Sequence, residues 1–108
     1  MGMFSASVLI LTYNRPGELR RNVSELTSEL SPDIEIIVID NNSEFWSEDI
    51  VSEFSNRVRF IFMDENIGVA ARNFGVKSCS SEFIITLDDD VFGLTQKSID
   101  LTMDLFRG

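Results

Sequence analysis

The sequence of 108 residues contains no histidine and a single cysteine. Without histidine, neither a Ser-His-Asp triad nor a zinc site of the usual cysteine and histidine ligands can form. The one cysteine has no partner for an internal disulfide, and no apolar run approaches the roughly 20 residues of a membrane-spanning helix. We therefore expect a cytoplasmic protein with no integral membrane segment; peripheral attachment at the inner face of the membrane is the alternative.

Basic residues are also few. Nine Lys and Arg oppose eighteen Asp and Glu, which gives a net charge of -9. This balance disfavours nonspecific attraction to nucleic acid or to anionic lipid, so an anionic ligand needs a cation or local hydrogen-bond donors. The apolar share of 44% supplies one hydrophobic core. The length predicts a single domain over residues 1–108.

Short apolar runs alternate with helical patterns along the whole chain. Apolar runs of strand length cover residues 8–11, 34–39 and 83–87, and residues 58–62 have a strand-like alternation of apolar side chains with Arg59 and Ile61. Helical spacing covers residues 16–30, 46–54 (beginning at Trp46), 69–76 and 99–106. Continuously apolar strands between helices are typical of parallel sheets with helices on both faces. The sequence thus predicts a doubly wound, Rossmann-like α/β domain with about four strands, and an order of 3-2-1-4 is the expected arrangement.

Polar clusters follow three of the predicted strands directly, at residues 12–15, 40–43 and 88–90. In an open parallel sheet, ligands bind beyond the carboxyl ends of the strands, where the strand order reverses. With the order 3-2-1-4, this reversal lies between the first and fourth strands. We therefore expect a crevice with Tyr13 as its wall and three aspartates as its floor.

The acidic run Asp88-Asp89-Asp90 suggests a cation site. Three adjacent carboxylates repel one another and are costly to keep ionised unless a cation or strong donors lie nearby. Oxygen ligands suit Mg²⁺ or Mn²⁺, which bind through one or two carboxylates together with substrate phosphates. The structural alternative is a solvated acidic turn that caps the following helix. The position directly after a buried strand favours a metal-diphosphate site.

Two further side chains suit a nucleotide ligand. Arg72 can pair with a phosphate or with an acidic neighbour such as Asp40, although a surface salt bridge is the simpler alternative. Tyr13 can stack on a base, with plain packing as its alternative. Gly68 and Gly75 permit tight turning and close helix packing. Only the combination of these residues argues for binding.

The position of Asp40 at the end of the second strand raises the hypothesis of a dinucleotide-dependent dehydrogenase, which places a ribose-binding acid there. The first strand is followed by Thr-Tyr-Asn-Arg-Pro-Gly at residues 12–17. This segment has no Gly-x-Gly-x-x-Gly, so the backbone cradle for a pyrophosphate is missing. The dehydrogenase hypothesis is therefore rejected.

Four segments together resemble family 2 glycosyltransferases of the GT-A fold, in the order and at the approximate spacing of that family. They are VLILTYNR at 8–15, EIIVIDNNS at 35–43, NIGVAARNFG at 66–75 and FIITLDDD at 83–90. The resemblance implies a metal-dependent enzyme that transfers a sugar, with inversion, from a nucleotide-diphosphate-sugar to an unknown acceptor. A UDP- or dTDP-sugar is the expected donor, although Asn41-Asn42 replaces the commoner Asp-Gly and leaves the nucleotide open.

The resemblance also assigns roles to individual residues. Thr12 and Tyr13 line the base, Asp40 accepts a hydrogen bond from the base N3–H, and Arg72 contacts the base or its acidic partners. Asp88 and Asp89 face the ribose, and Asp90 binds the metal. The nucleotide site implied in this way comprises Thr12, Tyr13, Asn14, Arg15, Asp40, Arg72, Asp88 and Asp89, with Asp90 as the ligand of Mn²⁺ or Mg²⁺.

Members of this family continue for a hundred or more residues beyond the acidic strand, and that part supplies the acceptor site and the catalytic carboxylate. We therefore expect this chain to be the truncated N-terminal half of such an enzyme, with no catalytic base, inactive alone, and prone to self-association through its uncovered sheet edge. Two alternatives remain. One is a haloacid-dehalogenase-like phosphatase with Asp88 as nucleophile and Asp90 as acid, and the other is a noncatalytic α/β binding module.

Overall fold

The computed structural model describes residues 4–45 and 48–107. In that part of the chain, four parallel strands form one sheet in the order β3-β2-β1-β4. The strands are β1 (Ala6–Thr12), β2 (Ile34–Asp40), β3 (Val58–Phe62) and β4 (Ile84–Asp88), and the helices are α1 (Pro16–Glu29), α2 (Glu48–Phe54), α3 (Ala70–Ser78) and α4 (Gln96–Arg107). The predicted α/β class and strand order are confirmed.

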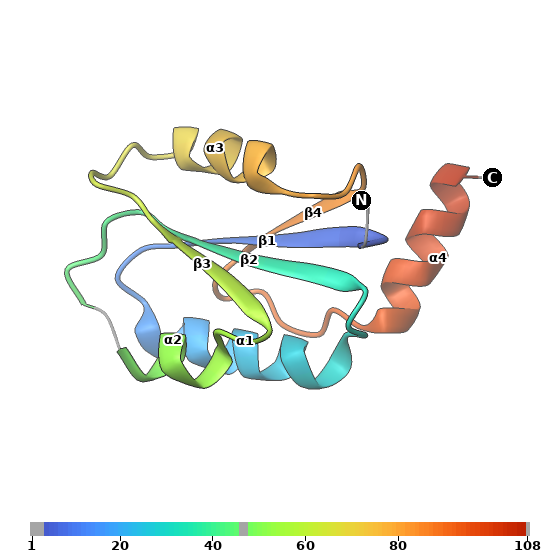
Figure 1. Cartoon of the computed structure of the whole chain (residues 1–108), viewed down its shortest axis with the longest axis horizontal. Coiled ribbons are helices and arrows are strands. Elements are labelled where there is room, and N and C mark those ends of the chain that lie inside the picture. The colour runs from blue at the N-terminus through green and yellow to red at the C-terminus, as the bar shows by residue number, and fades with distance from the viewer. Residues whose placement is uncertain (1–3, 46–47, 108) are drawn as a thin grey trace.

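The sheet is covered on both faces, by α1 and α2 on one side and by α3 on the other (Figure 1). Because side chains of a strand alternate between faces, β1 and β2 supply both cores. The larger core joins Val8, Ile10, Ile36 and Val38 to α1, α2 and α4. The smaller core joins Leu9, Ile37 and Ile39 to Ala71 of α3. Every residue of the central strand β2 is buried, as a strand between two helical layers requires.

Helix α1 follows the predicted pattern closely. Pro16 occupies its first turn, where a missing N–H is harmless. Leu19, Val23 and Leu26 are buried against the sheet at spacings of four and three residues. Because these contacts fix the start of the helix beside the end of β1, they also fix the position of the polar segment 12–15.

Helix α3 forms as predicted but packs differently. The spacing of Val69 and Val76 suggested an apolar side, whereas the structure buries Ala71 and Gly75 and leaves Val69 79% exposed. A Cβ atom on Gly75 would lie 2.7 to 2.9 Å from side-chain atoms of Leu9 and Ile39. The absent side chain therefore lets the helix backbone approach the sheet closely, which explains why the small residues face inward.

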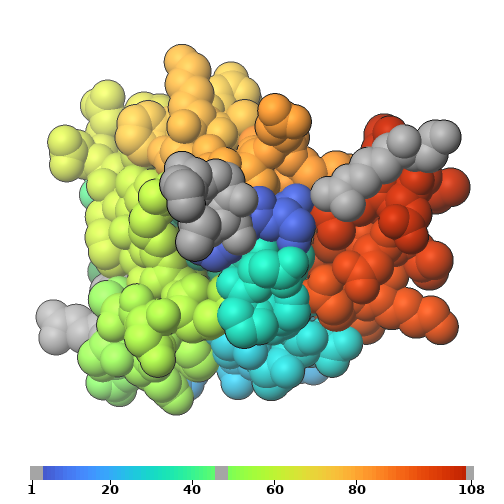
Figure 2. Space-filling view, turned by 45° about the vertical axis from the view of Figure 1, so that its right-hand side comes forward, coloured from blue at the N-terminus to red at the C-terminus, as the bar shows by residue number. Residues whose placement is uncertain are grey.

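Helix α4 lies at the amino ends of the strands, and the segment 89–95 runs back from the end of β4 to reach it (Figure 1). Gln96 accepts a hydrogen bond from the backbone N–H of Ser31, and Phe106 packs edge-on against Phe83. Figure 2 shows α4 forming one side of the molecule, next to the end of α1. Trp46, predicted to begin α2, lies outside the described residues. None of the helices in the described ranges has the length and apolar character needed to cross a membrane.

Candidate nucleotide-binding site

The carboxyl ends of β1, β2 and β4 share one edge of the sheet, because all the strands are parallel. Between the ends of β1 and β4, at the predicted reversal of strand order, lies a cavity of about 340 Å³. It is lined by Leu11 of β1 and by residues of the three polar clusters predicted from the sequence, namely Thr12, Tyr13, Arg15, Asn41, Asp88, Asp89 and Asp90. Tyr13 and the three aspartates thus share one cavity.

Asp89 is the buried acid of this cavity, with 6% of its surface exposed. The Thr12 hydroxyl donates a hydrogen bond to Asp89 Oδ2 at 2.8 Å, and Arg15 Nη1 lies 3.8 Å from Asp89 Oδ1. Burial raises the pKa of the Asp89 carboxyl, and the like charge of Asp90 adds to this effect. The hydrogen bond from Thr12 and the charge of Arg15 oppose the rise without cancelling it.

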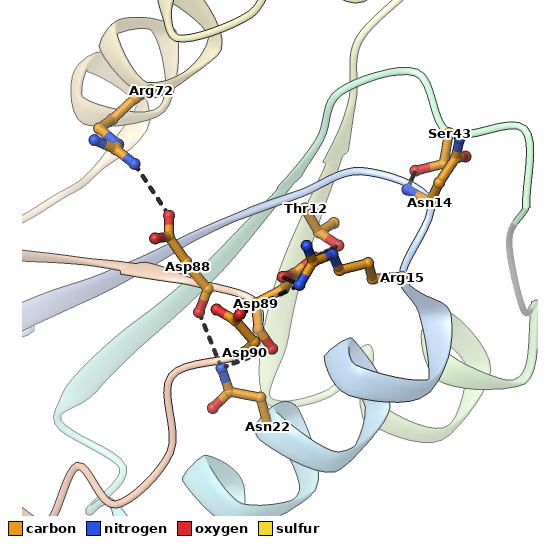
Figure 3. A network of polar contacts seen from close by, with 9 residues as sticks. All are labelled: Thr12, Asn14, Arg15, Asn22, Ser43, Arg72, Asp88, Asp89 and Asp90. Atoms are coloured by element: carbon orange, nitrogen blue, oxygen red, sulfur yellow. Dashed lines mark hydrogen bonds and ion pairs between the residues drawn. The ribbon is translucent and has the colours of Figure 1, made fainter.

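Asp88 points away from the other two aspartates, towards Arg72, whereas Asp89 and Asp90 both lie beside Arg15 (Figure 3). Asp88 pairs with Arg72 at 3.2 Å, and Asp90 pairs with Arg15 at 3.2 Å. Asp40, expected from the sequence as an acidic neighbour of Arg72, is not its partner in the structure. The physical reason is that the Asp40 carboxylate is buried and already bonded to the loop that follows it.

The arrangement of the aspartates decides which kind of metal site they fit. Within the described residues, no group of three acidic, histidine or cysteine side chains is placed to hold a metal ion. The side chain of Asp90 is 52% exposed at the cavity, whereas that of Asp89 is 8% exposed. The residues therefore fit a cation bound through one accessible carboxylate, with a ligand's phosphate oxygens completing the shell.

Asp40 and Asn14 organise the loop beside the cavity. Asp40 Oδ2 accepts a hydrogen bond from the Ser43 backbone N–H at 2.9 Å, and its other oxygen accepts from the Ser43 hydroxyl. Asn14, at a positive φ of 54°, donates its N–H to Ser43 Oγ and accepts the N–H of Glu44 with its side chain. Neither residue lines the cavity itself, although Asp40 keeps unused lone pairs on both carboxylate oxygens.

Two buried asparagines at this edge were not among the predicted site residues. Asn41 bonds the loop before α3, through Gly68 O and the N–H of Ile67. Asn22 of α1 is fully buried beneath the acidic turn and points its amide at that turn. Its signal in the sequence was a polar residue three positions after Leu19, on the apolar side of the helix.

Comparison with known proteins agrees with this geometry. The sequence profile of glycosyl transferase family 2 matches residues 7–96. The chain is 32% identical over 94 residues to the poly(ribitol-phosphate) beta-N-acetylglucosaminyltransferase TarP of Staphylococcus aureus, covering 82% of this chain and 29% of that protein. It is 33% identical over 90 residues to the putative glycosyltransferase EpsH of Bacillus subtilis, covering 80% of this chain and 26% of that protein.

Solved structures share the fold at lower identity. Residues 1–349 of S. aureus TarS, crystallised with UDP-GlcNAc, superpose with a TM-score of 0.82 at 21% identity, over 96% of this chain and 31% of that one. A mannosyltransferase from Pyrobaculum calidifontis, solved with GDP-Man and Mn²⁺, gives 0.76 at 16% identity, over 91% and 31%. The architecture is therefore that of GT-A glycosyltransferases, and the chain spans between a quarter and a third of the length of these relatives.

Proposed function

The chain belongs to glycosyl transferase family 2, and from this premise we propose that residues 7–96 bind the nucleotide-diphosphate-sugar donor of a sugar-transfer reaction. One observation carries the proposal: the cavity at the carboxyl edge joins an aromatic side chain, Tyr13, to the acidic turn that ends in Asp90. The first suits a base and the second suits a cation on a diphosphate. Sugar transfer to an acceptor is proposed for the whole enzyme, of which these residues are one part.

The base of a UDP- or dTDP-sugar would lie against Tyr13, which is 42% exposed at the cavity. An exposed aromatic ring at a strand end offers a stacking surface without first having to leave a packed core. Thr12 and Asn14 hold the surrounding segment. Asp40 is the proposed acceptor of the base N3–H, and its buried carboxylate would reach the base only after the loop bonded to it through Ser43 moves aside. The crystal structure of TarS with UDP-GlcNAc supports this choice of nucleotide.

The diphosphate would lie beside Asp90 and Arg15. Three carboxylates face two guanidinium groups here, in a chain of net charge -9, so an anionic ligand meets a negative surface. Bound Mn²⁺ or Mg²⁺ would reverse that local sign and stabilise the departing diphosphate. Arg15 would then exchange its contact with Asp90 for a phosphate, and the pairing of Arg72 with Asp88 would keep the third carboxylate turned aside.

We propose inversion at the sugar, with a base that deprotonates the acceptor hydroxyl located outside these residues. Helix α4, which contains Asp100 and Asp104, lies at the amino ends of the strands (Figure 1), whereas the cavity lies at their carboxyl ends. The acids of the cavity are engaged with Thr12, Arg15 and Arg72. This stretch alone is therefore expected to bind the donor without transferring sugar.

Calorimetry with UDP, in Mn²⁺ and in EDTA, tests the proposal. The parent should bind UDP only with Mn²⁺, and Asp90→Ala should lose most of the affinity together with the dependence on metal. Tyr13→Ala should lose about 1 to 3 kcal/mol of binding but keep the metal requirement, because stacking needs no cation. Asp104→Ala removes the same charge at the other end of the sheet and should leave binding unchanged.

Equal binding of UDP in EDTA would defeat the metal-assisted proposal. Family membership argues against the phosphatase and the noncatalytic module. Phosphatase turnover that is lost in Asp88→Asn would nevertheless revive the former.

We also propose a cytoplasmic setting for this chain, with which its one unpaired cysteine is consistent.

We further propose that this chain associates with itself. β4 is an edge strand, and the nearby α4 exposes Leu101, Leu105 and Phe106. An unpaired strand edge beside exposed apolar side chains favours pairing with a second copy. Light scattering at rising concentration should show dimers or larger species, and a monomer at every concentration would contradict this.

A further inference from the structure

Asn22 combines full burial with contacts to the backbone of the acidic turn. It lies on the inward side of α1, between Leu19 and Leu26, and none of its surface is exposed. Its Nδ2 donates to Asp88 O at 3.4 Å and to Asp89 O at 3.5 Å, across 66 and 67 residues of sequence (Figure 3). A buried amide is unfavourable in a helix–sheet core unless it is hydrogen-bonded.

The orientation of this amide follows from its neighbours. Turning the group over would place Asn22 Oδ1 against two carbonyl oxygens, so the NH₂ group must face the turn. In this orientation, Oδ1 is buried and has no hydrogen-bond partner among the described residues. An apolar residue would fill this position without leaving an acceptor unpaired. Packing alone therefore does not account for an asparagine here.

The two bonded carbonyls belong to the turn that presents the acids of the cavity. Asp88 O also accepts the N–H of Val91 at 3.2 Å, which closes the turn. Arg15, directly before α1, contacts the carboxylates of Asp89 and Asp90, while Asn22, about two helical turns further on, holds the backbone beneath them. Arg15 and Asn22 between them thus contact both the side chains and the main chain of the acidic turn.

We propose that Asn22 is a positioning residue for donor binding, which fixes the height of the acidic turn so that Asp90 meets the donor's diphosphate. The inference rests on the proposed function, because it concerns the same cavity. Asn22 touches neither the cavity nor the donor and acts only through the backbone of Asp88 and Asp89.

Two variants separate positioning from stability. Asn22→Leu removes both the NH₂ group that bonds the turn and the unpaired Oδ1, and replaces them with an apolar side chain of similar size. Asn22→Ala removes the same two groups and leaves a smaller side chain. We expect either variant to weaken UDP binding in Mn²⁺ by about tenfold, or about 1.4 kcal/mol. Val23→Ala, at the next position of α1, removes only apolar contacts, so it should lower the melting temperature while leaving UDP affinity unchanged.

Hydrogen exchange of the Val91 amide gives a readout that needs no ligand. It should be faster in both Asn22 variants than in the parent and unchanged in Val23→Ala, when measured well below the melting temperature. Parent-like UDP affinity in the Asn22 variants would overturn the inference. If the parent itself fails to bind UDP, the proposed function is wrong. The positioning role of Asn22 is tested separately, because it is wrong if the Val91 amide is as well protected in the Asn22 variants as in the parent.

Discussion

Two buried carboxylates lie at opposite ends of this sheet, each hydrogen-bonded by a side chain of β1. Ser7 Oγ donates to Glu35 Oε1 at 2.7 Å at the amino end, and Thr12 Oγ1 donates to Asp89 Oδ2 at 2.8 Å at the carboxyl end. Both acids are 6% exposed. The two hydroxyl-bearing residues are about 17 Å apart along an extended strand. Although the two side chains are equally buried, their pKa values shift in opposite directions.

Glu35 is satisfied within the fold. Besides the bond from Ser7, it accepts the backbone N–H of Ser80 at 2.7 Å and the Ser80 hydroxyl at 2.9 Å. Burial alone would raise the pKa of Glu35, but these hydrogen bonds, helped by the charge of Arg59, outweigh it and lower the pKa. The acid thereby ties β1, β2 and the segment before β4 together.

Asp89 is less well compensated. Its burial, reinforced by the like charge of Asp90, raises its pKa despite the hydrogen bond from Thr12 and the charge of Arg15. The comparison teaches that burial by itself does not mark a functional acid. The acid whose hydrogen bonds do not offset the effect of its burial is the one beside a cavity, where a ligand or cation can add a further favourable contact.

Removing Glu35 should have the largest effect on the fold. Glu35→Ala leaves the Ser80 N–H without its acceptor, and we expect a loss of about 2 to 3 kcal/mol of unfolding free energy. UDP affinity below the melting temperature should stay within about twofold of the parent, because the cavity lies at the far end. Urea unfolding and calorimetry measure the two quantities. If Glu35→Ala left the unfolding free energy unchanged, or greatly weakened UDP binding, Glu35 would not be a structural acid distinct from Asp89.

Asp89→Asn should have a smaller effect on stability, of the opposite sign. Because the pKa of Asp89 is raised in the folded state, its contribution to the free energy of unfolding is full below its ordinary pKa of 3.8. This contribution is lost as the pH rises through the raised pKa. The variant should therefore gain up to about 1 kcal/mol at pH 7 and bind UDP more weakly. This gain should shrink as pH falls towards 3.8, as urea unfolding at several pH values would show.

Glu35→Gln supplies the reciprocal test. The lowered pKa of Glu35 means that its stabilising contribution is present above its ordinary value of 4.5 and is lost as pH falls through the folded-state value. The Gln variant should therefore be less stable than the parent at pH 7 and lose less on acidification below 4.5. If the unfolding free energies of the parent and of the Glu35→Gln variant changed with pH in the same way, the lowered pKa of Glu35 would be contradicted.

The sequence was sufficient to predict the sheet and its order, because strand-length runs such as 34–39, apolar except for Glu35, alternate with helical spacing. It also predicted which polar clusters meet, since parallel strands place their ends at one edge. The close helix packing expected at Gly75 is confirmed, but the sequence did not predict that Ala71 faces inward while Val69 is exposed. Val69 and Val76 carry the apolar signal, but the close approach at Gly75 depends on the position of Leu9 in another element.

The finer geometry of the site also lay beyond the sequence pattern. Three adjacent aspartates look equivalent in the chain, yet a turn sends Asp88 towards Arg72, Asp90 towards Arg15, and Asp89 inward. Such divergence depends on long-range contacts, among them that of Asn22, which no local periodicity encodes. The roles of these residues in binding a donor remain predictions.

We propose above all that the nucleotide-sugar donor binds at the carboxyl end of the sheet and that this binding requires a cation. Paramagnetic Mn²⁺ broadens the NMR signals of nuclei near it, so it reports where it binds. With UDP and a small amount of Mn²⁺, the amide signals of Tyr13, Arg15 and Asp90 should disappear while those of Glu35 and Ser80 persist, and EDTA should restore the lost signals. Loss centred on Glu35 and Ser80, or UDP-induced shifts that are equally large in EDTA, would contradict the account.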